Sequence, residues 1–130
     1  MTDIKDSKIL IDTDIIIDYF RGIGNLGKII DNSSNNKCYI SVISIAEIYS
    51  NIFPQEYDMV ERFLTLLEIV NVDKVISKLA GIYRMEFYKS HFLGIPDSLI
   101  AASVKVTDTF LITRNIKHFP MNDIQIIKPY

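Results

Sequence analysis

The amino-acid sequence predicts an α/β fold of three layers, in which helices cover both faces of a central, mostly parallel sheet of four to five strands. Short apolar runs that favour strands alternate along the chain with stretches of helical periodicity, as in strand–helix–strand units. Several of these runs end at a polar residue that can begin a helix. The chain has 130 residues, 48% of them hydrophobic, enough for a single domain over residues 1–130 with a substantial core.

The first strand and the first helix meet at Asp12. An apolar run beginning at Lys8 predicts a buried strand that stops at Asp12. From Asp14 onward, apolar residues recur at helical spacing until Gly22, which is suited to the left-handed position after a last helical turn. Asp12 is therefore expected at the carboxyl end of the strand, and a helix N-cap would by itself explain an acidic residue there.

The second strand is predicted to begin at Cys38 and to give way to a helix that contains Glu47. Ser44 and Glu47 have the spacing of a capping box, with Ser44 as N-cap and the glutamate reaching back to its amide. Capping alone would account for this glutamate. A glutamate in the first turn of a helix also lies at the carboxyl edge of the preceding strand, and hence near Asp12.

A later helix is predicted to open at Pro96, with Asp97 in its first turn, where a carboxylate complements the helix dipole. Another strand ends near Thr113 and breaks into a polar turn, in which Asn115 alone would pass for an ordinary turn residue. The remaining expected elements are a second helix after Gly22, a polar surface loop at 32–36, helices at 56–68 and 73–89, a short strand at 69–72 and a last strand at 124–127.

Four side chains thus fall where strands end or helices begin, and ligand sites in α/β folds lie outside the carboxyl ends of strands. We therefore expect them to converge at one edge of the sheet. Their carboxylate and amide oxygens are hard ligands that suit Mg²⁺, with Mn²⁺ as a substitute. The four candidates are Asp12, Glu47, Asp97 and Asn115.

The order and spacing of these segments resemble the PIN-domain ribonucleases, and among them the VapC-type toxins of bacterial toxin–antitoxin pairs. The resemblance runs from Ile9 to about Ile127 and implies a PIN-like fold. It implies that Asp12, Glu47 and Asp97 are metal-binding acids and that Asn115 replaces a fourth acid carried by many members. Asp14 stands where asparagine is usual. The segments that carry the resemblance are Ile-Asp12-Thr-Asp-Ile-Ile-Ile-Asp-Tyr-Phe-Arg-Gly, Ser44-Ile-Ala-Glu47, Pro96-Asp97-Ser-Leu-Ile-Ala-Ala and Leu-Ile-Thr113-Arg-Asn115-Ile-Lys-His-Phe.

The resemblance implies a Mg²⁺-dependent endoribonuclease, a cytoplasmic toxin that forms a homodimer and binds a cognate VapB-like antitoxin. An anionic RNA phosphodiester would be repelled by the acids unless divalent cations lay between them. Asp12 and Asp97 are expected as direct ligands, Glu47 as a ligand or as the group that orients the attacking water, and Asn115 as a weaker neutral ligand. Weaker candidates are Thr13 and Thr113, which could hold carboxylates in place, Asp14, which adds charge, and Arg114, which could contact RNA.

Composition excludes some other classes. The net charge of −2 is not that of a non-specific nucleic-acid binder, and a single cysteine, Cys38, rules out an intramolecular disulfide. The polar N-terminus lacks the apolar core of a signal peptide, and no apolar run approaches membrane-spanning length, so a soluble intracellular protein is expected.

Two alternatives stay open at this point. The opening segment also resembles that of a haloacid-dehalogenase-like phosphatase, in which Asp12 would be the nucleophile and Asp14 the general acid. That interpretation leaves Glu47 without a role. The other alternative is a non-catalytic PIN-like interaction module, in which the acids serve only as helix caps.

Overall fold

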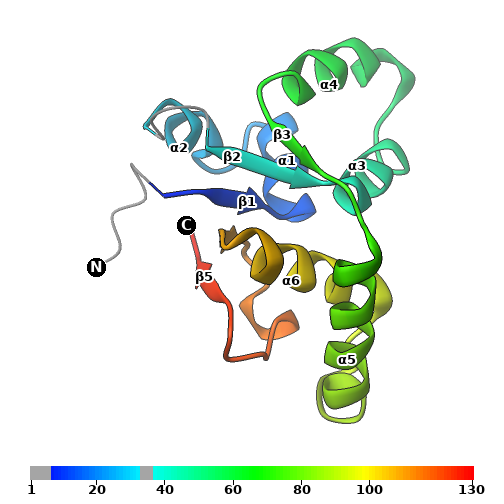
Figure 1. Cartoon of the computed structure of the whole chain (residues 1–130). Coiled ribbons are helices and arrows are strands. Elements are labelled where there is room, and N and C mark those ends of the chain that lie inside the picture. The colour runs from blue at the N-terminus through cyan, green and yellow to red at the C-terminus, as the bar shows by residue number, and fades with distance from the viewer. Residues whose placement is uncertain (1–6, 33–36) are drawn as a thin grey trace.

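A computed structural model describes residues 7–32 and 37–130 (Figure 1). Residues 1–6 and most of the predicted loop at 32–36 lie outside the described residues. The elements follow the expected alternation: β1 (Ile9–Ile11), α1 (Thr13–Phe20), α2 (Leu26–Asn32), β2 (Cys38–Ser41), α3 (Val42–Tyr49), η3 (Pro54–Glu56), α4 (Tyr57–Leu64), β3 (Glu68–Val70), α5 (Lys74–His91), α6 (Ile95–Thr107), β4 (Phe110–Ile112), η4 (Ile116–His118) and β5 (Gln125–Ile127).

The five strands form one sheet in the order β3-β2-β1-β4-β5, and all neighbouring strands are parallel. The predicted α/β fold is confirmed. The chain builds outward from β1 through β2 to β3, and then crosses to the other side of β1 to add β4 and β5. The direction of winding therefore reverses between β1 and β4, and such a switch point is where α/β sheets open a site at the carboxyl ends of their strands.

Alternating side chains of the central strands supply two cores, one on each face of the sheet. Ile9 and Ile11 pack with α1, α2 and α4 on one face, whereas Leu10 packs with α5 and α6 on the other. Figure 1 shows α2 and α4 on one side of the sheet and α5 and α6 on the other. All of β1 and the last two residues of β4 are buried, so the carboxyl ends of both strands lie within the packed core.

Helix caps fix the transitions from strand to helix. The Asp12 carboxylate caps α1 by accepting the backbone N–H of Thr13 at 2.8 Å, as its position predicted. Beyond the end of α1, Gly22 has a φ of +74°, the left-handed conformation that was expected of it. Helix α6 begins at Ile95 and carries Asp97 in its first turn, also as expected.

The predicted N-cap at Ser44 is wrong. Strand β2 ends at Ser41, whose hydroxyl accepts the N–H of Ile43 at 3.1 Å, so α3 begins three residues earlier than expected. The β-branched residues that follow Ser41 favour a strand locally, which concealed the start of the helix in the sequence. Glu47 consequently lies in the second turn of α3, and its side chain does not cap the helix.

Candidate active site

Asp12 is the most deeply buried acid of the site, with only 6% of its surface exposed. One carboxylate oxygen accepts the N–H of Thr13, and the other accepts the hydroxyl of Thr113 at 2.8 Å. Burial, the neighbouring charge of Asp14 and, more weakly, that of Asp97 raise the pKa of Asp12 to about 7, despite the two hydrogen bonds. The site therefore holds this carboxylate in place without compensating its negative charge.

Asp14 lies in the first turn of α1 and is held by the turn that follows β4. Its Oδ2 accepts the backbone N–H of Arg114 at 3.0 Å and the side-chain amide of Asn115 at 3.1 Å. Burial raises the pKa of Asp14, although the backbone N–H groups of Arg114 and Ile15 and the Arg114 charge act in the opposite direction. The nitrogen of the Asn115 amide is thus engaged with Asp14, which leaves its oxygen as the atom that could serve as a ligand.

Glu47 is brought to the same edge by α3 and is bound by Thr13. The Thr13 hydroxyl lies 2.6 Å from Glu47 Oε1 and 2.9 Å from the Ser44 hydroxyl. Since a hydroxyl has one proton to give, Thr13 can donate to the carboxylate and accept from Ser44. Ser44 therefore supports the position of Glu47 through Thr13, a role different from the cap that its spacing suggested.

Asp97 is half-buried at the start of α6, and its Oδ2 lies 3.6 Å from Nδ1 of His118. Burial raises the pKa of Asp97. His118 opposes this shift, whereas the negative charges of Glu47 and Asp14 add to it. Asp97 therefore shares an electrostatic environment with the acids of α1 and α3, which come from distant parts of the sequence.

The structure thus gathers the predicted residues at the switch point of the sheet. Three of them are linked to the acids by side-chain hydrogen bonds. Asn115 donates to Asp14, Thr113 donates to Asp12, and Thr13 donates to Glu47. Within residues 7–32 and 37–130, no three His, Cys, Asp or Glu side chains are already spaced as a set of metal ligands. A cation bound at this edge would have to draw the carboxylates closer together.

Arg114 has a different partner from the one that its position suggested. Its Nε lies 2.7 Å from Oδ2 of Asp18, a buried residue of α1, and the hydroxyl of Tyr130 donates to the same oxygen at 2.7 Å. Gly24, with a φ of +83°, makes room for the Tyr130 ring, because a Cβ there would lie 2.3 Å from it. Asp18 was not among the predicted site residues, because its hydrogen bond to Tyr130 joins residues 112 positions apart and its partner Arg114 is also distant in the sequence.

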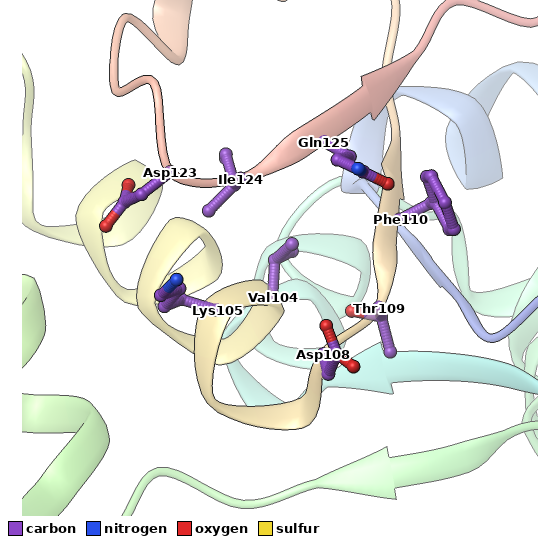
Figure 2. A pocket seen from close by; sticks show the side chains of 8 residues that line it. All are labelled: Val104, Lys105, Asp108, Thr109, Phe110, Asp123, Ile124 and Gln125. Atoms are coloured by element: carbon purple, nitrogen blue, oxygen red, sulfur yellow. The ribbon is translucent and has the colours of Figure 1, made fainter.

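A small cavity at the opposite edge of the sheet does not belong to this site. It has a volume of about 160 Å³ and lies at the amino ends of β4 and β5 (Figure 2). Its lining includes Lys105, Asp108 and Asp123 but none of the candidate residues. Asp108 therefore offers an acidic position that is separated from the candidate site by the length of β4.

The fold and the site together define an α/β protein with a carboxylate cluster at the switch point of a parallel sheet. Residues 9–121 match the family model described as the PIN domain. The chain belongs to the PIN-domain family.

Curated relatives and solved structures agree with this assignment. The chain is 33% identical to Ribonuclease VapC10 of Mycobacterium tuberculosis over 115 aligned residues. The aligned region covers 87% of this chain and 86% of that protein. A toxin–antitoxin complex from Klebsiella pneumoniae contains a similar chain, with a TM-score of 0.74, 27% identity and coverage of 94% of this chain and 98% of that one. DNA-bound VapBC from Salmonella typhimurium, at 22% identity, has the same fold with a TM-score of 0.78 and coverage of 93% and 97%.

Proposed function

We propose that this protein is a divalent-metal-dependent endoribonuclease that acts as the toxin of a toxin–antitoxin pair. The observation that carries the proposal is the convergence of Asp12, Asp14, Glu47 and Asp97 at the switch point of the sheet. Burial raises the pKa of Asp12, Asp14 and Asp97, and repulsion among these acids adds to the shift at Asp12 and Asp97. Nuclease activity is the function named for the curated relative at 33% identity.

The donor set fits a divalent cation. Asp12, Glu47 and Asp97 would hold it, with the amide oxygen of Asn115 as a neutral ligand, and all four offer the hard oxygen atoms that Mg²⁺ and Mn²⁺ prefer. The pKa of about 7 at Asp12 reflects negative charge that the protein leaves uncompensated. A cation is the natural compensation for such charge, because it favours the ionised carboxylates that burial disfavours.

Each side chain then has a defined task. Thr13 holds an oxygen of Glu47 and Thr113 holds an oxygen of Asp12, and each hydroxyl thereby limits the movement of an acid that would bind the ion. We expect Glu47 to bind the ion or to orient the attacking water. The chemistry that a bound ion supplies is neutralisation of the phosphodiester charge and activation of the attacking water.

The partner follows from the solved relatives. These relatives come from a toxin–antitoxin complex and from VapBC assemblies bound to DNA. We infer that this chain binds a small VapB-like antitoxin that inhibits it. The homodimer stays a prediction. No helix among the described residues is both long enough and apolar enough to span a membrane.

Neither alternative function is favoured. A haloacid-dehalogenase-like phosphatase would use Asp12 and Asp14, but the chain belongs to the PIN-domain family and its curated relatives are ribonucleases. A non-catalytic module is not favoured either, because the curated relatives at 33% and 31% identity are named ribonucleases.

Purified protein should cleave single-stranded RNA only when Mg²⁺ or Mn²⁺ is added, since the acids would otherwise repel the phosphodiester. Cleavage of a labelled RNA is measured across a metal titration and after addition of EDTA. The matched control is Asp108→Asn, which removes one negative charge at the far edge of the sheet and should behave like wild type; asparagine also suits the left-handed backbone at that position (φ +54°). Undiminished activity in EDTA, in preparations free of contaminating nuclease, would refute metal dependence.

Expression of the wild-type protein should arrest cell growth, and co-expression of the small protein encoded beside it should relieve the arrest. Growth curves with Asp12→Asn and Asp108→Asn test whether toxicity requires the carboxylate at the candidate site or is affected by the loss of any one negative charge, because both variants lose one carboxylate. Only Asp12→Asn should be harmless. A wild-type protein that cleaves RNA in vitro yet leaves growth unaffected at equal expression would count against the toxin role.

A further inference from the structure

The turn after β4 is fastened to the first helix by three consecutive residues. Thr113 donates its hydroxyl to Asp12, Asn115 donates its side-chain amide to Asp14, and the backbone N–H of Arg114 also reaches Asp14. Strand β4 itself pairs with β1 over only three residues, from Phe110 to Ile112. The position of the turn relative to α1 therefore depends on contacts made beyond the end of the strand.

Arg114 makes the fourth of these contacts, one helical turn further along α1. Asp14 and Asp18 are four residues apart, which places them on the same face of the helix. The backbone of Arg114 binds the first carboxylate at 3.0 Å, and its guanidinium binds the second at 2.7 Å. One residue thus spans two acids of α1, so that any shift of its side chain is coupled to the N–H that holds Asp14.

The ion pair between Arg114 and Asp18 is unequal in burial. The side chain of Asp18 is 11% exposed and that of Arg114 is 43% exposed. A carboxylate that is buried to this extent requires a charged partner, and loss of the partner leaves it uncompensated. Arg114 is therefore attracted toward a buried carboxylate, and its Nε already forms an ion pair with Asp18.

We propose that Asp18 and Arg114 are positioning residues, which clamp the turn 113–115 against α1 and so fix Asp14 and Asn115 at the edge of the site. This inference rests on the proposed ribonuclease activity and adds Asp18 and Arg114 to the residues that support its site. In this arrangement the Arg114 side chain binds Asp18 within the protein, whereas its place in the sequence suggested a contact with RNA.

The two roles of Arg114 predict opposite effects for Asp18→Asn. If Arg114 contacted RNA, loss of the Asp18 charge would free the guanidinium and lower KM, and Arg114→Gln would raise KM with a shallower salt dependence of RNA binding. If the pair positions the turn, both substitutions lower kcat and leave KM nearly unchanged. We expect a decrease in kcat of about 10–100-fold for each, the range typical of groups that orient ligands. The double variant should be no worse than either single variant, because all three break the same link.

A second measurement does not depend on catalysis. Hydrogen exchange of the Arg114 backbone amide, followed by NMR without RNA or metal, reports the bond to Asp14 directly. Exchange should accelerate about tenfold in Asp18→Asn and Arg114→Gln, as expected when a charge-assisted hydrogen bond no longer closes the turn. Arg114→Lys keeps a cation within reach of Asp18 and should recover part of both the protection and kcat.

Two control variants distinguish the role of the Asp18–Arg114 ion pair from the effect of losing another contact to Asp18 and from the effect of losing a positive charge elsewhere. Tyr130→Phe removes the other hydrogen bond to Asp18 but keeps the ion pair, and Lys78→Gln removes an exposed positive charge on α5. Both should keep wild-type kcat and exchange rates. If Asp18→Asn does not fold, as judged by circular dichroism, Arg114→Gln carries the test, because its side chain is the more exposed partner.

The outcomes are distinguishable. An Asp18→Asn protein with wild-type kcat, a lower KM or an unchanged Arg114 exchange rate would overturn the inference, as would an equal loss in Tyr130→Phe. A wild-type protein that cleaves no RNA would refute the proposed function instead. The exchange rates would then decide by themselves whether the pair clamps the turn.

Discussion

Asp12→Asn is expected to abolish RNA cleavage and, at the same time, to stabilise the metal-free protein. Cleavage should fall by roughly three orders of magnitude, the scale on which loss of one group that stabilises transition-state charge is felt. Stability should rise because the substitution removes a buried charge whose pKa the fold raises to about 7. The hydrogen bonds can survive, since the Thr113 hydroxyl can accept from the new amide in place of donating to the carboxylate.

The stabilisation by Asp12→Asn should depend on pH. The ordinary pKa of Asp12 is 3.8 and the folded value is about 7, so between these values the folded state holds a proton that the unfolded state has released. The free energy of unfolding of the wild type therefore falls as pH rises through this window, by a total of about 2–4 kcal/mol, and levels off above it. In Asp12→Asn this fall should be largely absent.

Urea unfolding of both proteins from pH 4 to 8, in EDTA, measures the difference. Added Mg²⁺ should stabilise the wild type at pH 8 and have little effect on Asp12→Asn, because only the wild type keeps the full set of acids. Asp108→Asn serves again as the control for loss of one charge. Parallel stability profiles of wild type and Asp12→Asn across this range would contradict the assignment of the buried, uncompensated charge to Asp12.

Asn115→Asp is expected to destabilise the metal-free protein and to increase its response to Mg²⁺. The side-chain amide of Asn115 donates to Asp14 at 3.1 Å, so a carboxylate there would replace an attraction by a repulsion. The melting temperature without metal should fall by about 5–10 °C. A fourth acid should also bind Mg²⁺ more tightly than the neutral amide, which lowers the Mg²⁺ concentration needed for half-maximal cleavage. Asn115→Ala should raise that concentration or inactivate the protein.

Thermal melts with and without Mg²⁺ test this, and Asn122→Asp adds the same charge at an exposed position as a control. The double change Asp14→Asn with Asn115→Asp restores a donor–acceptor pair with the roles exchanged, and it should recover part of the lost melting temperature. If all these proteins melted at one temperature and shared one Mg²⁺ dependence, Asn115 would be a turn residue without influence on the site.

The fold class and the approximate elements follow from local features of the sequence. Apolar runs, helical spacing and the cap at Asp12 each involve residues within a few positions of one another, so their effects can be inferred without knowledge of distant contacts. The acids at the ends of the strands could be singled out because parallel strands bring their carboxyl ends to one edge. The start of α3 at Ser41 was missed because β-branched residues obscured a helix that tertiary packing favours.

Only the tertiary structure decides which partners these side chains have. Asp14 is held by residues about 100 positions away, Glu47 by Thr13 in another helix, and Arg114 by a buried acid with no local relation to it in the sequence. Hydrogen bonds and ion pairs form over about 3 Å, whereas the periodicity of a sequence places a residue only on a face or at an edge. The sequence by itself therefore determined which residues reach the switch point, and the packing of α1, α3 and α6 around β1 and β4 determined how they bind one another there.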